Sequence, residues 1–343
     1  MDPFRLGSRN IGRGHPPLVV PEIGINHEGS IAKAKRMVDD AAKAGAEAVK
    51  FQTHSTYDEM VPNDVVPGNS DESIWNIIDR CSLTRDEERD LKAYTESKGL
   101  LYLSTPFSRE AADFLNELGV CAFKIGSGEC NNLPLVKQIA SYKKPLIIST
   151  GMNDLASISR TVEAVREVGV PFALLHCTSL YPTPWSAVRL GALSEMRSAF
   201  PDAVIGLSDH TLTNHVAIAS VALGAAILER HFTSEKGWPG PDIEISMSPG
   251  ELEDLVRGSQ NVFRALGGSK EILPEEQPTI DFAYASVVTT NAIAKGDAFS
   301  RDNLWVKRPG TGEFRAADYE LLLGKVASRD LPKDYLLRKS DIS

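Results

Sequence analysis

One short stretch, Phe123-Lys124-Ile125-Gly126-Ser127-Gly128-Glu129, brings a cation, small residues and a carboxylate together. Lys124 interrupts an apolar segment, and a charge there is costly in a core unless it meets a partner or a ligand. The Gly-Ser-Gly turn allows backbone N–H groups to approach an anion closely, and Glu129 follows as an acid/base group. The stretch predicts an anion-binding strand end, with a flexible loop beside a surface lysine as the alternative.

Comparable polar residues recur where other apolar segments end. If side chains alternate between the two faces of each predicted strand, one face carries Glu22, Lys50, Gln52, Thr105, Lys124, Ser149, Ser179, Ser208, His210 and His231. Two lysines among hydroxyls, with Ser127 nearby, suit a small and highly charged anion such as a phosphate ester or a carboxylate. The alternatives are serine hydroxyls bonded to the backbone and lysines that extend to solvent.

His210 and His231 end consecutive predicted strands, which lie ~4.8 Å apart when they are neighbours in a sheet. Two imidazoles at that spacing predict a shared divalent ion, whereas a lone histidine at a strand end is more often structural. No thiolate or third histidine joins the pair, which argues against a closed zinc site. An open octahedral Mn²⁺ or Mg²⁺ site fits better, with Asp209 as a candidate to orient an imidazole.

The elements that must position these groups alternate between apolar strands and amphipathic helices. We predict strands at 18–24, 48–54, 100–107, 122–126, 145–151, 172–179, 203–210 and 226–233, with helices between them such as 31–44, 85–98, 155–168, 188–199 and 214–223. Eight such units are typical of an α/β protein with a (β/α)₈ TIM barrel, whose chemistry lies at the carboxyl ends of the strands. A doubly wound open sheet is the alternative.

Domain boundaries follow from changes in this pattern. We expect a leader or poorly ordered tail at 1–17, a barrel at 18–267 whose last helix covers 249–266, and a polar linker at 268–282. Residues 283–343 show short strands and turns with little helix, which indicates a small and mostly β domain. For residues 55–82, which include Pro62, Pro67 and Gly68, we predict a long loop on the catalytic face.

Composition limits the class of function. The 343 residues are 42% hydrophobic and 24% charged, and the apolar runs are shorter than the ~20 residues of a membrane span. A net charge of −9 argues against nucleic acid and anionic membranes as partners. The four cysteines show no CxxC pair, which favours reduced thiols and a cytoplasmic location.

Longer motifs surround the candidate residues. They are Glu22-Ile23-Gly24-Ile25-Asn26-His27-Glu28-Gly29, Lys50-Phe51-Gln52-Thr53, Ser104-Thr105-Pro106-Phe107, Lys124 to Glu129, Ser149-Thr150-Gly151-Met152, Tyr181-Pro182-Thr183-Pro184, Gly206-Leu207-Ser208-Asp209-His210, Glu229-Arg230-His231-Phe232-Thr233 and Gly240-Pro241-Asp242. From about Leu18 onward the chain resembles the bacterial N-acetylneuraminate (sialic acid) synthase family. The segment with Lys307-Arg308-Pro309-Gly310 resembles that family's antifreeze-like (SAF) domain, and Ser179 replaces an asparagine that close relatives often have.

The resemblance implies a condensation of phosphoenolpyruvate with N-acetylmannosamine, assisted by Mn²⁺ or alternatively by Mg²⁺ or Co²⁺. It implies that His210 and His231 bind the metal and that Glu22 and Glu129 handle protons. Phosphoenolpyruvate would bind Lys50, Thr105, Lys124, Ser127, Ser149, Ser179 and Ser208, and the sugar would bind Gln52, Tyr181, Asp242 and Arg308.

Other interpretations remain open at this point. The acceptor can instead be a 2,4-diacetamido-2,4,6-trideoxymannose, leading to legionaminate, or N-acetylmannosamine 6-phosphate. A Schiff-base aldolase or lyase would use Lys124 or Lys50 as nucleophile, and a non-catalytic sugar-binding protein would use the barrel only as a scaffold. We also expect a domain-swapped homodimer in which Arg308 enters the partner's site; Arg308 is otherwise a solvated loop residue.

Overall fold

The computed structural model describes residues 3–343, and the chain divides between Gly267 and Gly268 into two compact units. The larger unit contains eight parallel strands: β3 (Leu18–Gly24), β4 (Ala48–Thr53), β5 (Leu101–Pro106), β6 (Phe123–Ile125), β7 (Leu146–Ser149), β8 (Phe172–Cys177), β9 (Val204–Asp209) and β10 (Ile227–His231). Their order around the sheet is β5-β4-β3-β10-β9-β8-β7-β6, and β5 contacts β6 at the seam. The predicted (β/α)₈ barrel is confirmed, and the open sheet is excluded.

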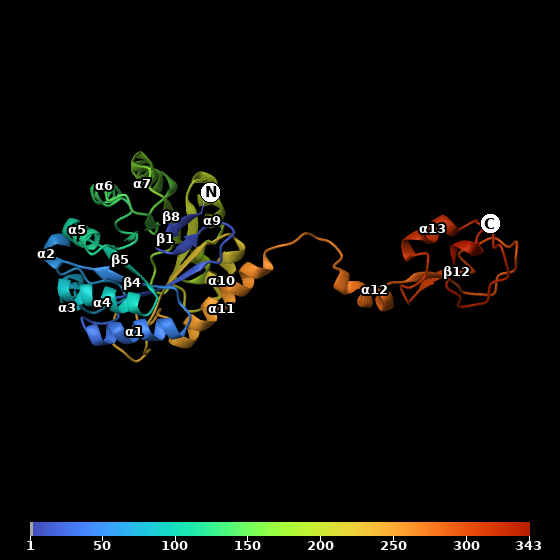
Figure 1. Ribbon diagram of the computed structural model, residues 1–343, viewed down its shortest axis with the longest axis horizontal. Helices are drawn as coiled ribbons and strands as arrows, with labels where there is room; N and C mark the ends of the chain where they lie inside the picture. Colours follow the sequence, from blue (N-terminus) through green and yellow to red (C-terminus); the bar gives the residue numbers. More distant parts are fainter. Residues whose placement is uncertain (1–2) are drawn as a thin grey trace. The chain divides into compact units, whose positions relative to one another are not determined.

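Helices surround these strands (Figure 1). They are α1 (Ile31–Lys43), α4 (Arg85–Ser97), α5 (Arg109–Glu117), α6 (Leu133–Ser141), α7 (Leu155–Val168), α8 (Trp185–Val188), α9 (Gly191–Ala199), α10 (His215–Ala222) and α11 (Pro249–Ala265). Side chains fix several helix starts: Ser30 caps α1, and the pairs Thr84/Glu87 and Ser248/Glu251 form capping boxes on α4 and α11. The predicted helix at 188–199 is broken at Arg189, which adopts a positive φ of 54°.

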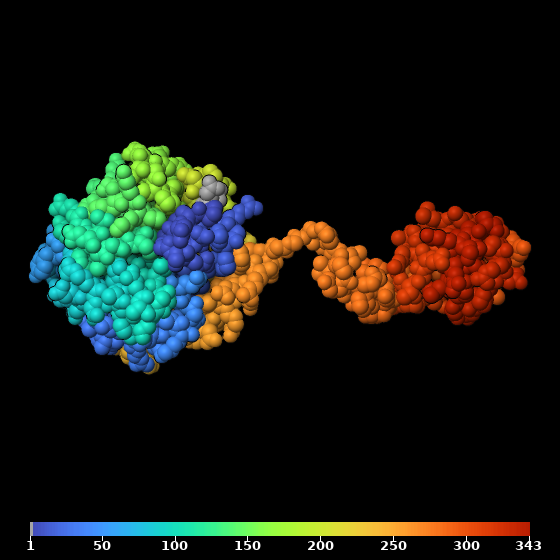
Figure 2. Space-filling view, viewed as in Figure 1, coloured from blue at the N-terminus to red at the C-terminus, as the bar shows by residue number. Residues whose placement is uncertain are grey.

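The N-terminal segment differs from the tail that the sequence indicated. Two short strands, β1 (Phe4–Leu6) and β2 (Arg9–Ile11), pair as an antiparallel hairpin. Leu6 and Ile11 are fully buried, in one cluster with residues that begin the barrel strands such as Leu18. Figure 2 shows the hairpin as a dark-blue patch seated among the atoms of the barrel. Burial explains its order, since so short a hairpin is at best marginally stable alone.

The segment 55–82 is also more regular than the predicted loop. It contains α2 (Thr56–Glu59) and α3 (Ile74–Cys81), and Ser73 caps the second helix. Ile74, Ile77, Ile78 and Cys81 follow the i, i+3, i+4, i+7 spacing of an apolar helix face. Ile77, Ile78 and Cys81 are buried in a small satellite cluster with Ile25. This helical insert covers part of the carboxyl end of the barrel.

Inside the barrel, the character of the side chains changes along each strand. Near the amino ends the interior is apolar, with Leu18, Val20, Ala48, Leu103, Ala122, Ile147, Ala173, Leu175, Val204 and Ile227 in one cluster. Gly206 is required by close packing there, because a Cβ atom would overlap the carbonyl oxygen of Ile227 and the side chain of Leu175. Towards the carboxyl ends the inward side chains become polar or charged, and these form the site described below.

The smaller unit has its own core. Strands β11 (Ser286–Thr289) and β12 (Leu304–Lys307) pair antiparallel, and a short helix, α13 (Tyr319–Leu322), follows them. Val287, Phe299, Leu304 and Leu337 are buried together. The expected linker is not wholly irregular, because α12 (Gln277–Ala283) forms where Ile280 becomes buried. Each helix within residues 3–343 is too short or too polar to span a lipid bilayer.

Candidate active site

The carboxyl end of the barrel contains two adjoining cavities. The inner cavity, of about 310 Å³, is lined by strand-end residues that include Lys50, Lys124, Ser149 and Ser208. The outer cavity, of about 380 Å³, lies between the strand ends and the helical insert. Gln52, Phe107, Tyr181 and His231 line both. A molecule in one cavity can therefore react with a molecule in the other.

Four buried charges organise the inner cavity. Lys50 Nζ lies 2.6 Å from Glu22 Oε2 and 3.8 Å from Glu229 Oε1, while Lys124 Nζ lies 3.4 Å from Glu229 Oε1. Lys124 also donates to Ser149 Oγ at 2.7 Å. Each of the four side chains is less than a tenth exposed. Both lysines are thus held without solvent, with hydroxyls beside them, which suits the binding of a small dianion or trianion.

The two carboxyls differ in their electrostatic setting. Burial raises the pKa of Glu22, and the neighbouring Glu229 raises it further against the opposing effect of Lys50. Burial also acts to raise the pKa of Glu229, but Lys124 and Lys50 together hold it below its usual value. For Lys50 the largest influence is burial, which lowers the pKa, yet Glu22 and Glu229 raise it overall. Glu22 is consequently the carboxyl better suited to exchange a proton.

His210 and His231 lie at neighbouring strand ends, as predicted, with ring centroids 5.4 Å apart. His210 Nδ1 is 3.0 Å from the carbonyl oxygen of Thr178, and if it donates there, Nε2 keeps the lone pair that binds a metal. Burial lowers the pKa of His231 well below its usual value, and the neighbouring His210 lowers it further. Its buried Nδ1 has no hydrogen-bond partner in residues 3–343, and Asp242 Oδ2 lies 3.7 Å away.

The donors present fit some metal sites and not others. Across residues 3–343, no cluster of three or more histidine, cysteine, aspartate or glutamate side chains has the geometry to hold an ion. A closed four-ligand zinc site is therefore excluded for the described residues. Two imidazoles, one with an orphaned nitrogen, fit an ion that takes its remaining ligands from water and substrate oxygens.

Asp209 does not serve the histidine pair. Its carboxylate lies 3.3 Å from Arg230 Nε and accepts from the backbone N–H and the hydroxyl of Thr211. The alternation of side chains along β9 places Asp209 on the opposite face from Ser208. The expectation that Asp209 orients His210 is wrong, and the carbonyl oxygen of Thr178 occupies that position instead.

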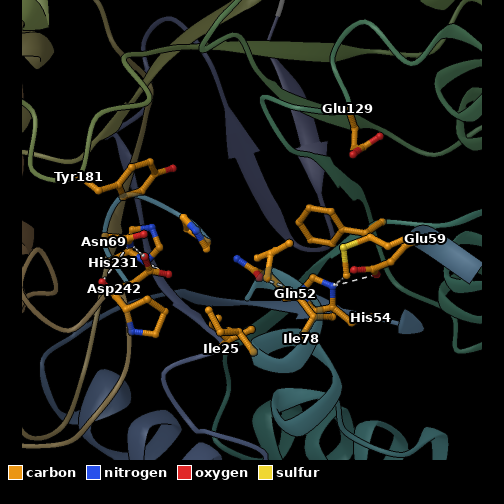
Figure 3. Close-up of a pocket in the computed structure, with 16 residues that line it drawn as sticks. Ile25, Gln52, His54, Glu59, Asn69, Ile78, Glu129, Tyr181, His231 and Asp242 are labelled. Carbon is orange, nitrogen blue, oxygen red and sulfur yellow. Dashed lines mark hydrogen bonds and ion pairs between the residues drawn. The ribbon is translucent and has the colours of Figure 1, made fainter. Parts of the chain in front are cut away.

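The outer cavity combines one polar side with one apolar side (Figure 3). Tyr181 stacks on His210 with centroids 4.2 Å apart, and Asn69 donates to Asp242 at 3.3 Å. Burial raises the pKa of Asp242 to about 6. The apolar side is formed by Ile25, Met60, Ile74, Ile77 and Ile78, which we call the isoleucine wall.

The structure brings most of the predicted site residues together. Glu22, Lys50, Gln52, Thr105, Lys124, Ser127, Ser149, Ser179, Tyr181, Ser208, His210 and His231 all line the inner cavity. Asp242 and Glu129 line the outer cavity, and Glu129 accepts from Asn132 Nδ2 at 2.8 Å. Arg308 belongs to the smaller unit, where it is exposed. Ser127 and Ser179 flank Gly151, where a Cβ atom would overlap both hydroxyls.

Sequence reasoning missed four residues of the site. Glu229 lies two positions before His231 on the same face of β10, so strand alternation was sufficient to find it. His54 and Glu59 are bonded at 2.9 Å and line the outer cavity. Asn69 reaches the cavity from the insert. His54 follows Lys50 and Gln52 at a two-residue spacing, so strand alternation also pointed to it. Glu59 and Asn69 are placed only by the fold of the insert, and the sequence contains no equivalent signal for them.

Comparison with known proteins identifies the family. The model of the NeuB family matches residues 37–271, and that of the SAF domain matches residues 284–343. The chain is 38% identical over 332 residues to an N,N'-diacetyllegionaminic acid synthase of Campylobacter jejuni, covering 94% of this chain and 99% of that protein. It is 34% identical to the N-acetylneuraminate-9-phosphate synthase of Homo sapiens, covering 92% and 90% of the two chains.

Solved structures agree with this grouping. The crystal structure of an N-acetylneuraminic acid (sialic acid) synthetase from Leptospira borgpetersenii, in complex with citrate, superposes with a TM-score of 0.75 and 32% identity. The match covers 81% of this chain and 95% of that one. Together, the family model, the full-length similarity and the shared fold show that this chain belongs to the NeuB family and carries an SAF domain.

Proposed function

We propose that this protein condenses phosphoenolpyruvate with the open-chain aldehyde of an N-acetylmannosamine-type sugar and water, giving an N-acetylneuraminate-type acid and phosphate. The observation that carries the proposal is the pair of adjoining cavities. One holds two buried lysines among hydroxyls, and the other has the size and mixed polarity of a sugar site. The names of the relatives in Campylobacter jejuni and Homo sapiens support a nonulosonic acid synthase.

The inner cavity would bind phosphoenolpyruvate through its cations and hydroxyls. Lys124 with Ser149, and Lys50 with Thr105, form two donor pairs whose members lie 2.7 and 3.3 Å apart. Phosphate and carboxylate groups are the anions that such charge-assisted donors select. Ser127, Ser179 and Ser208 add further hydroxyls. Glu229, which lies near both lysines, keeps them fixed in position.

The reaction has a balanced course in this geometry. Carbon 3 of phosphoenolpyruvate forms a bond with the aldehyde carbon, whose oxygen takes up a proton, and a cation is left at carbon 2. Water adds to that carbon and releases a proton, which gives a tetrahedral intermediate. As the C–O bond to phosphate breaks, the C2 hydroxyl becomes the keto group and its proton passes to the leaving phosphate. Glu22 is the candidate for these proton transfers because burial raises its pKa. Glu129, on the outer cavity, is the second candidate.

His210 and His231 would hold the divalent cation, with Mn²⁺ the first choice and Mg²⁺ or Co²⁺ as alternatives. A bound cation would supply Lewis-acid polarisation of the sugar aldehyde. Tyr181, stacked on His210, and Asp242, 3.7 Å from His231, would orient the sugar beside the histidines. Gln52, which donates to Glu22 at 3.0 Å, lines both cavities and would contact the sugar at the boundary.

A Schiff-base aldolase is the second candidate function, and one observation favours it. Burial lowers the pKa of Lys124, which is the direction expected for an imine-forming lysine. Its 3.4 Å approach to Glu229 and its bond to Ser149 favour the charged form instead. Borohydride treatment in the presence of each substrate tests this function, because only an imine mechanism traps substrate on Lys124.

The decisive assay measures phosphate release from phosphoenolpyruvate with candidate acceptor sugars, with and without Mn²⁺. We expect release that needs both an N-acetylated mannosamine-type sugar and the cation. Release without any sugar would indicate a phosphatase, and a complete absence of release with every acceptor would contradict the proposal.

The four cysteines of the chain are all free, which supports the expected cytoplasmic location.

We further propose that the protein is a homodimer in which the SAF domain of each subunit completes the site of the other. The smaller unit has its own core around Val287 and Leu304, so it can fold as a body separate from the barrel. Arg308 is exposed on this unit beside Pro309. It would donate to the acetyl carbonyl oxygen of the sugar, because the N–H groups of a guanidinium point in fixed directions and can orient a carbonyl group.

Complementation tests the exchange of SAF domains. Two inactive variants, His231→Ala and Arg308→Ala, are unfolded and refolded together. If the SAF domains are exchanged, each mixed dimer contains one site with a wild-type barrel and a wild-type Arg308, and activity returns. If each domain completes its own barrel, every site carries one lesion. Activity that stays absent, while the mixed dimer forms, would rule out the exchange.

A further inference from the structure

The outer cavity has an unusual charge distribution for a protein whose other substrate is an anion. Within the described part of the larger unit, none of the residues that line this cavity is a lysine or an arginine. Three carboxyls line it instead, namely Glu59, Glu129 and Asp242. A phosphate group on the acceptor would face these carboxyls without a cation from the barrel to offset the repulsion. This distribution of charge favours an uncharged acceptor.

The polar groups beside the isoleucine wall are already bonded to one another. His54 Nδ1 lies 2.9 Å from Glu59 Oε2, and His54 Nε2 lies 2.9 Å from Gln52 Oε1. Gln52 in turn donates to Glu22 at 3.0 Å. Phe107 stacks on the His54 ring with centroids 4.4 Å apart, which fixes its orientation. A sugar hydroxyl beside His54 and Glu59 would lose water and find these two side chains already bonded to each other.

The isoleucine wall itself offers only aliphatic groups and the weakly polar thioether of Met60. Ile25, Ile77 and Ile78 are buried, and Ile74 and Met60 are partly exposed where they pack against them. Arg80, on the same helix as Ile74 and Ile78, offers no free cation to this wall, since it pairs with Glu28 and with Glu72. In Figure 3, His231 and Asp242 lie on one side of the cavity, and Ile78, His54 and Glu59 lie on another. An acceptor whose aldehyde faces the histidines therefore turns its far end towards the wall.

We infer that the acceptor of this protein is an uncharged, N-acetylated sugar with a methyl group in place of the C6 hydroxymethyl group. The inference rests on the proposed function and selects among its three acceptors. It favours a 2,4-diacetamido-2,4,6-trideoxymannose over N-acetylmannosamine, and it excludes N-acetylmannosamine 6-phosphate. The selecting elements are the isoleucine wall, which takes the methyl group, and the carboxyls, which reject phosphate.

Two sugars that differ by a single oxygen atom provide the sharpest test. N-acetylmannosamine and 6-deoxy-N-acetylmannosamine are compared with phosphoenolpyruvate and Mn²⁺ on the full-length protein. We expect kcat/KM to be about 10- to 100-fold higher for the 6-deoxy sugar, the usual discrimination of an apolar pocket. For the 6-phosphate we expect no measurable turnover. Equal values for the first two sugars, or efficient use of the 6-phosphate, would overturn the inference.

Calorimetric binding of the same three sugars separates this inference from the proposed function. If no sugar supports phosphate release, the proposed synthase activity is wrong. The order of binding affinities still tests the selectivity of the outer cavity, because binding is measured without any turnover. A 6-deoxy sugar that binds about 10-fold or more tightly than N-acetylmannosamine supports the inference. Preferential binding of the 6-phosphate contradicts it.

Substitutions at Ile74, which is only partly buried, test the role of the wall. Ile74→Thr introduces a hydroxyl, and we expect the preference for the 6-deoxy sugar to fall about 3- to 10-fold with an unchanged KM for phosphoenolpyruvate. Ile74→Lys introduces a cation, and we expect measurable binding of the 6-phosphate. The matched control is Val66→Thr, in the same insert but about half exposed and not among the residues that line the cavity. Sugar preference that is equal in all three variants would show that the wall does not select.

Discussion

The two ends of the barrel are built from the same eight strands but from opposite kinds of side chain. On β4, Ala48 belongs to the apolar interior and Lys50, two residues later on the same face, belongs to the inner cavity. On β10 the corresponding pair is Ile227 and Glu229. The amino end is closed by the N-terminal hairpin, whereas the carboxyl end stays open. On both strands, the inward side chains change from apolar to charged between one inward position and the next.

This contrast teaches that stability and chemistry are separated along the strands. Full burial of a leucine or isoleucine stabilises a fold by about 1.5–3 kcal/mol, and the amino end contains many such residues. Buried lysines and carboxylates contribute little net stability, since the cost of removing them from water offsets their attraction. We therefore expect substitutions at the carboxyl end to remove activity with little loss of stability, and substitutions at the amino end to do the reverse.

The largest expected effect is at the carboxyl end. His231→Ala removes one of the two proposed metal ligands, and we expect loss of bound Mn²⁺ with a fall in kcat of about 10³-fold or more, since Lewis-acid catalysis supplies several kcal/mol. The thermal midpoint should change little. The control is His215→Ala, because His215 is exposed and bonds Thr213 outside the site. Full turnover after exhaustive chelation would falsify the metal assignment.

The next effect is expected at the amino end. Leu6→Ala leaves a cavity beneath the hairpin, where Leu6 is completely buried. We expect the free energy of unfolding, measured with urea, to fall by about 2–5 kcal/mol while kcat at 25 °C is unchanged. Arg5→Ala, on the exposed side of the same strand, is the control. If Leu6→Ala lowers kcat before it lowers stability, the separation between the two ends is wrong.

A smaller effect on substrate binding is expected for Lys124→Ala. The loss of a charge-assisted contact costs roughly 1.5–3 kcal/mol, which should appear in kcat/KM for phosphoenolpyruvate and much less in that for the sugar. Lys137→Ala, in the exposed part of α6, is the control. An equal loss for both substrates would assign Lys124 a structural role and weaken the division into two cavities.

The smallest effect concerns a buried carboxyl on α4, outside the barrel interior. Burial raises the pKa of Glu88 to about 7, against the effect of the 2.6 Å bond from Thr53. A raised pKa means that the stability linked to the protonated form is complete below the unfolded pKa and is lost as the pH rises through 7. Between pH 5 and 8 we expect the wild type to lose about 1–2 kcal/mol relative to Glu88→Gln.

Urea unfolding at both pH values measures this difference, with Glu96→Gln, at an exposed position of the same helix, as the control. A constant difference between wild type and Glu88→Gln across this range would show that Glu88 is already ionised in the fold. Ionisation of Glu88 would then cost no stability, and only the charges of the inner cavity would carry a cost of burial.

The sequence was sufficient to predict the barrel strands and most of the inner cavity. Strand alternation is strictly two residues, so the parity that places Lys50 inward also places Gln52 there. The same rule points to Glu229, two positions before His231, as an inward residue. Residues such as Glu59 and Asn69 were not predictable in this way. They reach the site from the insert, whose path depends on contacts with other segments, such as that between Asn69 and Pro241.

The sequence by itself determined the periodic features: the eight β/α units, the polar strand ends and the histidine pair, because these depend on spacing within one segment. Only the tertiary structure decided the features that depend on distant segments. The hairpin of Phe4–Leu6 and Arg9–Ile11 is ordered because the barrel buries it. Asp209 faces Arg230 rather than His210. The charge balance of the outer cavity arises where the insert meets the strand ends. Electrostatic interactions act through space between distant segments, so no repeating sequence pattern predicts them.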